Sequence, residues 1–290
     1  MGISSPEAIA DWVETSLLVR NSGSLALDRT LQLGREELGV SGNRVSMALQ
    51  VMSQRANTLG VLYPFEVVDG IAVKRRQNSP FVNSYATLLL LTPSSVARQI
   101  VPGLSVAGMS ELMEDIATRA LSNYWGPGGE AIRFGYPSTH GRPKEFDQAV
   151  VWLANRIGVS PGLGYRPPRR KDGGVDVVAW RRFFDKRAGF PLALAQCTIQ
   201  EEKFTKTTDI DVRLWSTWLA LDRDPLSILV LPGTVQRAGP YWAQLTSVVT
   251  VIERLRLVEL LARSEDLDTP RVWTTSVTSN LAERLAAAED

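Results

Sequence analysis

Residues 171–180 read KDGGVDVVAW, and residues 194–197 read LAQC. Both segments are short and largely apolar, which is typical of buried β-strands. The first leaves a glycine turn and carries a carboxylate, Asp176, and the second carries a polar side chain near its end, Gln196. An acid and a carbonyl oxygen on adjacent strands form the oxygen-rich site that a hard cation prefers. Such sites hydrolyse phosphodiesters, so these two strands are the first place to look for chemistry.

The composition is that of an ordinary globular protein. The chain has 290 residues, 44% of them hydrophobic and 22% charged, and its formal net charge is +1. This length predicts one large domain or two smaller ones. Since the net charge is close to zero, any binding of a polyanion requires a local basic patch.

Cysteine usage and hydropathy predict a cytoplasmic protein without membrane contact. Cys197 is the single cysteine, which excludes an internal disulfide framework and fits a reducing cytosol. The first residues are acidic rather than basic-then-apolar, unlike a signal peptide. No apolar run approaches the roughly 20 residues that span a bilayer.

Several classes of enzyme are excluded by the residues that the chain lacks. The single histidine, His140, lies in a segment with the composition of a loop. One histidine is too few for a zinc hydrolase or a histidine-based metal nuclease, and its place in a loop argues against a Ser-His-Asp hydrolase. The chain also lacks the glycine-rich phosphate loop, the nucleophile elbow and the dinucleotide-binding turn. Chemistry is therefore left to carboxylates, amides and lysines.

The first part of the chain predicts helices followed by a β-hairpin. We expect helices from residue 6 to about residue 60 and a hairpin over 62–74 with its turn at Asp69-Gly70. This order could form a winged helix that contacts DNA. The amphipathic helix offers only Arg44 and Arg55 as cations, which favours a scaffold or partner-docking module as the alternative. Its apolar stripe is Val45, Leu49, Met52, Ala56 and Leu59.

The remainder predicts an α/β domain with a mixed sheet flanked by helices. A helix is expected over 84–91, and Pro102-Gly103 is expected to end the first domain. Residues 1–103 would then form the helical module and residues 104–290 the second domain. Further helices are expected over 110–124, with Ser110 as the N-cap, and over 146–157, 202–221, 248–263 and 280–288. Further strands are expected over 131–136 and 226–231.

The motifs of residues 110–231 resemble the restriction-endonuclease-like superfamily of nucleases, PD-(D/E)xK, and within it the Mrr-like branch. The superfamily has an acid in its first core helix, an acid in a strand after a turn, and Glu or Gln two positions before a Lys in the next strand. Gly174-Val175-Asp176 matches the G-[IV]-D element of the branch, and Gln196-Cys197 begins its Q-x-K element. The helix that carries Glu114 takes the place of the first core helix.

The chain departs from this family at the lysine. Thr198 stands where the family has Lys, and a hydroxyl can neither carry a positive charge nor polarise water. Some members supply the lysine from a neighbouring helix, so Lys206 is the expected replacement and Lys203 the second choice. If neither ammonium reaches the site, the resemblance implies a protein that binds without cutting.

The resemblance and the residue chemistry imply one set of roles. Asp176 would be the principal ligand of Mg²⁺, which Mn²⁺ could replace, and Glu114 would bind the metal directly or through water. The Gln196 side chain or the Cys197 backbone carbonyl would complete the site, and Lys206 would orient or deprotonate the attacking water. Plainer interpretations stay open: Asp176 as a strand-end acid, Lys206 as a solvated lysine, and Glu111 or Asp115 in place of Glu114. Asp172 is expected to be a turn residue, and Cys197 is expected to be a strand residue rather than a nucleophile.

Basic residues flank the first strand and suggest how a substrate is held. Cations near an acidic, metal-bearing centre are typical of phosphate-backbone binding around a cutting site. Solvated loops are the alternative for any single one. The candidate DNA-binding residues are Arg169, Arg170, Lys171, Arg181, Arg182, Lys186 and Arg187, with Arg166 preceding them.

The sequence thus predicts a Mg²⁺-dependent DNA endonuclease, and the resemblance implies restriction or anti-phage defence. No motor motif is present, so a required ATPase or sensor would be a separate chain, and a homo-oligomer is an open possibility. Two alternatives remain: an inactive nuclease fold acting as a DNA-binding or assembly subunit, and a winged-helix regulator.

Overall fold

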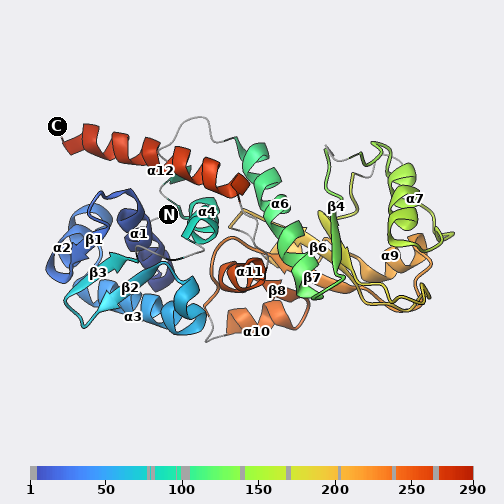
Figure 1. Ribbon diagram of the computed structural model, residues 1–290, viewed down its shortest axis with the longest axis horizontal. Helices are drawn as coiled ribbons and strands as arrows, with labels where there is room; N and C mark the ends of the chain where they lie inside the picture. Colours follow the sequence, from blue (N-terminus) through green and yellow to red (C-terminus); the bar gives the residue numbers. More distant parts are fainter. Residues whose placement is uncertain are drawn as a thin grey trace. The chain divides into compact units, whose positions relative to one another are not determined.

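The computed structural model forms two compact units (Figure 1). The helical unit comprises Met1–Met109, Pro232–Gln236 and Glu253–Asp290, and the sheet unit comprises Ser110–Leu231 and Arg237–Ile252. Within these, the structure describes residues 5–76, 79, 82–95, 97–98, 105–137, 141–167, 171–201, 204–236, 240–263 and 268–289. The division differs from the expected one at residue 103, because residues 253–290 pack with the N-terminal part of the chain.

The helical unit begins with three helices and a small antiparallel sheet of strand order β1-β3-β2. The predicted hairpin is β2–β3, and Asp69 and Gly70 at its turn have φ values of 40° and 68°. This left-handed pair is the turn geometry that Asp-Gly favours. The elements are α1 (Pro6–Val19), β1 (Ser24–Ala26), α2 (Leu27–Leu38), α3 (Gly42–Leu59), η1 (Gly60–Leu62), β2 (Phe65–Val68), β3 (Ala72–Arg75), α4 (Val82–Leu91), α11 (Arg254–Leu261) and α12 (Asp268–Glu289).

A buried ionic cluster explains why the C-terminal segment belongs to this unit. Arg55 on α3 was expected to be exposed, but it is buried, with Nη1 2.8 Å from Asp11 Oδ1 and 2.7 Å from Glu14 Oε1. Arg254 on α11 places Nη2 2.8 Å from Asp11 Oδ2. The Tyr63 hydroxyl donates to Glu14 over 2.5 Å. Because charges this deep require partners, these contacts hold α11 against α1 and α3.

The sheet unit contains five strands in the order β4-β5-β6-β7-β8. β4, β5 and β6 are antiparallel neighbours, and β7 and β8 run parallel to β6. The predicted mixed sheet flanked by helices is therefore confirmed. The elements are α6 (Val106–Tyr124, in this unit from Ser110), β4 (Glu130–Arg133), α7 (Phe146–Ile157), β5 (Val177–Trp180), β6 (Leu192–Cys197), α8 (Phe204–Thr207), α9 (Val212–Trp218), β7 (Leu226–Val230), α10 (Pro240–Thr246) and β8 (Thr250–Ile252).

An aromatic core covers one face of this sheet. Trp215 and Trp218 of α9 pack with Phe146 of α7 against β5 and β6, and Trp215 Nε1 donates to the Gly173 carbonyl over 3.1 Å. Alternate residues of a strand point to opposite faces. Val178 and Leu194 therefore enter this core, while their neighbours point to the other face of the sheet.

Several boundaries differ from the expected ones for local reasons. The helix before β4 starts at Val106, and Ser105 rather than Ser110 caps it, with its Oγ accepting from the Gly108 amide over 3.0 Å. The helix expected over 202–221 is two helices, because Asp211 caps α9 by accepting from the Leu214 amide over 2.9 Å. The helix expected over 248–263 is strand β8 followed by α11, which Glu253 caps.

The C-terminal helix is longer than predicted, beginning at Asp268 rather than near residue 280. Its residues Val277 and Leu281 pack with Leu90 of α4. No helix in the described part of the chain has both the length and the apolar character that crossing a membrane requires.

Candidate active site

Asp176 is presented by a tight glycine turn. Gly173 and Gly174 have φ values of 69° and 80°, in the left-handed region that side chains disfavour. A Cβ on Gly174 would also lie 2.2 Å from the Asp209 carbonyl oxygen. Asp172 stabilises this turn as expected, since its Oδ1 accepts from the Gly174 amide over 3.0 Å. The turn therefore requires both glycines and delivers the chain directly into β5.

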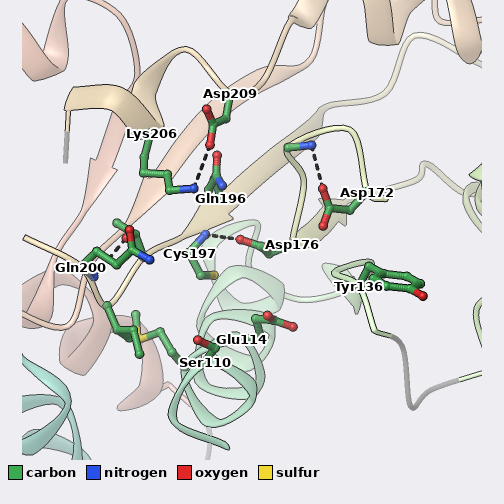
Figure 2. Close-up of a pocket in the computed structure, with 14 residues that line it drawn as sticks. Ser110, Glu114, Tyr136, Asp172, Asp176, Gln196, Cys197, Gln200, Lys206 and Asp209 are labelled. Carbon is green, nitrogen blue, oxygen red and sulfur yellow. Dashed lines mark hydrogen bonds and ion pairs between the residues drawn. The ribbon is translucent and has the colours of Figure 1, made fainter. Parts of the chain in front are cut away.

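The pairing of β5 with β6 brings the two predicted residues together. Val177 lies opposite Ala195, so the same register places Asp176 opposite Gln196. The Asp176 Oδ2 atom accepts from the Cys197 amide over 2.8 Å, and Figure 2 shows this bond at the edge of the cavity. The backbone of Asp176 is also held in place, because its main-chain carbonyl accepts from the Phe134 amide over 2.7 Å.

Glu114 of α6 is the one of the three candidate acids that lines the same cavity. Arg133 of β4 places Nη2 2.9 Å from Glu114 Oε2 and Nη1 3.1 Å from Asp115 Oδ1. Asp115 is 43% exposed and does not line the cavity, and neither does Glu111. Gly135 leaves room for Glu114, since a Cβ there would lie 2.9 Å from Oε2. The ion pair with Arg133 is a feature that the sequence did not predict.

Gln196 has an unusual polar atom. The side chain is 7% exposed, and its Oε1 is buried without a hydrogen-bond partner among the described residues. An unpaired buried acceptor costs about 1–3 kcal/mol, so such atoms commonly bind an ordered water or an ion. Since Gln196 lines the cavity, this oxygen is an acceptor that the described residues leave unpaired at the cavity wall.

Lys206 also reaches the cavity, as expected for the displaced lysine. Its Nζ lies 3.1 Å from Asp209 Oδ2, and both residues line the cavity walls (Figure 2). Thr198 lines it too, but its Oγ1 accepts from the Gln200 amide over 3.2 Å and offers no charge. Asp209 lines the cavity as well, and the sequence analysis did not identify it as a candidate site residue. Lys203 lies outside the described residues.

The cavity is polar and of moderate size, about 460 Å³. It brings together four predicted catalytic residues from three segments: Glu114 from α6, Asp176 and Gln196 from the paired strands, and Lys206 from α8. This is the arrangement in which titratable groups, a ligand-binding oxygen and an ammonium can act on one bound group.

Burial and neighbouring negative charge raise the pKa values of both acids, Asp176 and Glu114. Burial, followed by the nearby Glu114 carboxylate, raises the pKa of Asp176 to about 8, although the Cys197 amide and Lys206 oppose this shift. Burial also raises the pKa of Glu114, which the Arg133 guanidinium opposes. A bound cation would favour the ionised form of both carboxylates. Burial raises the pKa of the Cys197 thiol well above its usual range, which agrees with a strand residue rather than a nucleophile.

The described residues contain no cluster of three or more His, Cys, Asp or Glu side chains placed to hold a metal ion. Four carboxylates line the cavity, and two of them, Asp172 and Asp209, bind the Gly174 amide and Lys206, so the remaining donors are Asp176, Glu114, the Gln196 amide oxygen and backbone carbonyls. Mg²⁺ accepts such a set, because it commonly keeps several waters and uses one or two carboxylates.

The basic residues do not all surround this cavity. Lys171 adjoins Asp172 at its edge, but the other described candidates lie in the β5–β6 loop at the opposite end of the hairpin. The four residues of β5 span about 13 Å at 3.3 Å per residue, so these cations cannot rim the site. The residues at the far end are Arg181, Arg182, Lys186 and Arg187.

Arg166 is a structural residue. It pairs with Asp147 and donates to the Gly162 carbonyl over 2.7 Å, holding the loop after α7. Arg169, Arg170 and His140 lie outside the described residues.

Comparison with models of protein families, with curated proteins and with solved structures found no match to this chain.

Proposed function

We propose that the sheet unit is a metal-dependent endonuclease that hydrolyses DNA phosphodiester bonds. The observation that carries the proposal is the meeting of Glu114, Asp176, Gln196 and Lys206 at one polar cavity. The element order supports it, because the helix, the paired strands and the following helix occur as the resemblance to PD-(D/E)xK nucleases implies. Restriction or anti-phage defence, and a separate ATPase or sensor, remain implications of that resemblance alone.

The residues fit a Mg²⁺ ion, for which Mn²⁺ could substitute. Asp176 and Glu114 would hold it, and the unpaired Oε1 of Gln196 or the Cys197 carbonyl would add an oxygen. When bound, the ion supplies charge neutralisation at the phosphate and a more acidic water. Arg133 fixes the Glu114 carboxylate through its ion pair.

Lys206 would orient the attacking water and stabilise developing negative charge on the phosphate. Asp209 positions its ammonium through their ion pair. This role accounts for Thr198, which cannot supply the charge that the family places there.

The test is nicking of supercoiled plasmid with Mg²⁺ or Mn²⁺. Asp176→Ala and Lys206→Ala should each lower the rate by about 10²-fold or more, since each removes a transition-state contact. Glu130→Ala and Lys144→Ala are the matched controls, because both residues are exposed and outside the cavity. The proposal fails if wild type cuts with neither metal. Retained DNA binding in that case would favour an inactive nuclease fold.

A second candidate function, DNA binding by the helical unit, has its own support. The order α1-β1-α2-α3-β2-β3 with sheet order β1-β3-β2 is that of a winged helix. The whole of α3 lacks acidic residues, and its exposed positions are rich in amides, which can pair with adenine. These positions include Asn43, Ser46, Met47, Gln50, Gln54 and Asn57.

Substitution of this surface tests the second candidate. Gln50→Ala with Gln54→Ala should weaken the binding of a duplex by the full chain about tenfold. Glu36→Ala and Glu37→Ala on α2 serve as controls. Unchanged affinity would favour a scaffold or partner-docking role for this unit.

A further inference from the structure

The tip of the β5–β6 hairpin exposes two phenyl rings to solvent. Phe183 is 56% exposed and Phe184 is 107% exposed. Both lie in the loop between Trp180 and Leu192, which are the last paired residues of the two strands. Large apolar side chains exposed side by side at a protruding turn are a common feature of binding surfaces.

The turn holds these rings outward through its own bonds. The Lys186 amide donates to the Phe183 carbonyl over 3.1 Å, and the Arg187 amide donates to Asp185 Oδ1 over 3.1 Å. Lys186 has a φ of 57°, a conformation that a side chain other than glycine rarely adopts. Arg182 fastens the base of the loop by donating to the Lys186 carbonyl over 3.2 Å. The backbone that carries the two exposed rings is thus held by bonds within the loop.

The same tip is strongly basic. Arg181, Lys186 and Arg187 flank the two phenylalanines in the sequence and are exposed, and Asp185 is the sole acid among residues 181–191. Arg187 lies 3.8 Å from Asp185 with 86% of its side chain exposed, so the pair leaves much of the positive charge accessible. Aromatic faces interleaved with cations are complementary to a ligand that carries both flat apolar rings and negative charge.

We propose that this tip is a nucleic-acid contact separate from the cavity, with Phe183 and Phe184 against bases and the cations against phosphates. The inference rests on the proposed function in one respect: the strands that form the tip also carry Asp176 and Gln196. A nucleic acid bound at the cavity would be long enough to reach the tip, whereas an anionic lipid surface has no such link. Apolar wedges enter duplex base steps, and aromatic rings stack on unpaired bases.

The test is binding of fluorescein-labelled 20-mers, one duplex and one single strand, to the full chain in EDTA. Phe183→Ala with Phe184→Ala should weaken binding to one or both probes about tenfold or more. Its salt dependence should not change, because phenyl rings release no counterions. Leu163→Ala is the matched control, since Leu163 is a 103% exposed apolar residue elsewhere in the sheet unit.

Three further variants separate the contribution of the rings from that of the cations. For the single strand, Phe184→Trp should retain affinity and Phe184→Leu should lose it, since only the first keeps a ring for stacking on unpaired bases. Arg187→Gln should lower the slope of log affinity against log salt by about 0.9 for the duplex. Unchanged thermal unfolding checks that all variants fold.

This experiment separates failure of the tip proposal from failure of the proposed catalytic function of the cavity. Binding is measured in EDTA, where no cutting occurs, so a loss of affinity in the double Phe variant reports on the tip whether or not the cavity is catalytic, and Leu163→Ala should bind as wild type does. Equal affinity of wild type and the double Phe variant for both probes overturns the proposal. So does a tip that binds phosphatidylserine vesicles through Phe183 and Phe184 while nucleic-acid binding is unchanged.

Discussion

Asp176 is held at one oxygen by the Cys197 amide while its charge is opposed by burial and by Glu114. In the absence of a cation, this environment favours the protonated acid at neutral pH. Gln196, across the hairpin, keeps an acceptor without a partner among the described residues. A buried acid with a raised pKa beside an unpaired buried acceptor is the combination that marks a candidate functional site.

The raised pKa of Asp176 predicts a pH dependence of stability. Between its ordinary value of 3.8 and about 8, the unfolded chain loses a proton that the folded chain retains. The unfolding free energy should therefore fall as pH rises from 4 to 8, at up to about 1.4 kcal/mol per pH unit. Asp176→Asn should remove this part of the dependence, as measured by urea unfolding in EDTA at several pH values.

Asp185→Asn is the control for that experiment, because it changes an exposed acid in the same unit. A wild-type profile parallel to that of Asp176→Asn between pH 5 and pH 8 would contradict the assignment of a buried, protonated Asp176.

The spacing of residues in the sequence could not identify which acid of α6 faces the paired strands. Glu111, Glu114 and Asp115 lie within five positions of one helix, and any of them could have faced the strands. Glu114 does so because Arg133 and the missing side chain of Gly135 make room for it and bind it. Arg133 and Gly135 are 19 and 21 positions away from Glu114 in the chain, so no local sequence pattern predicts these contacts.

At the scale of elements, strong local signals were reliable. The helix Phe146–Ile157 ends at Gly158 as predicted, with a φ of 73° at that glycine. The hairpin β2–β3 and strand β7 lie where the sequence placed them. The strands β1 and β8 were missed, because three residues are too few to show a period of two.

The ionic cluster of α1, α3 and α11 predicts a large effect of a single substitution. Arg254 is 0% exposed, and its removal would leave Asp11 and Glu14 buried with one fewer cation. Arg254→Met should therefore lower the unfolding free energy by about 3–5 kcal/mol, measured by urea denaturation. The matched control is Arg256→Met, an exposed position on the same helix, which should change stability by less than about 0.5 kcal/mol.

A loss below about 1 kcal/mol for Arg254→Met would contradict the role given to this cluster. Adding Asp11→Asn to Arg254→Met should recover part of the loss, because it removes one of the carboxylates left without its partner.

At the scale of the whole molecule, the division into units was the least predictable feature. The helical unit takes residues from both ends of the chain and a short piece at Pro232–Gln236. The sequence predicts helices in this part of the chain, and six of the eight residues of α11 are buried, but the helical pattern does not show which surface covers them. Arg254 and its contacts with Asp11 decide this for α11, and Leu90 with Val277 and Leu281 for α12.

The sequence by itself determined strands β5 and β6, the glycine turn before Asp176, the mixed sheet and the set of candidate site residues. These features depend on local periodicity and turn chemistry. Only the tertiary structure decided that Glu114 and Lys206 join Asp176 and Gln196, and that most of the described basic residues lie at the other end of the hairpin. Strand register and helix packing set those positions, and both depend on contacts between residues far apart in the chain.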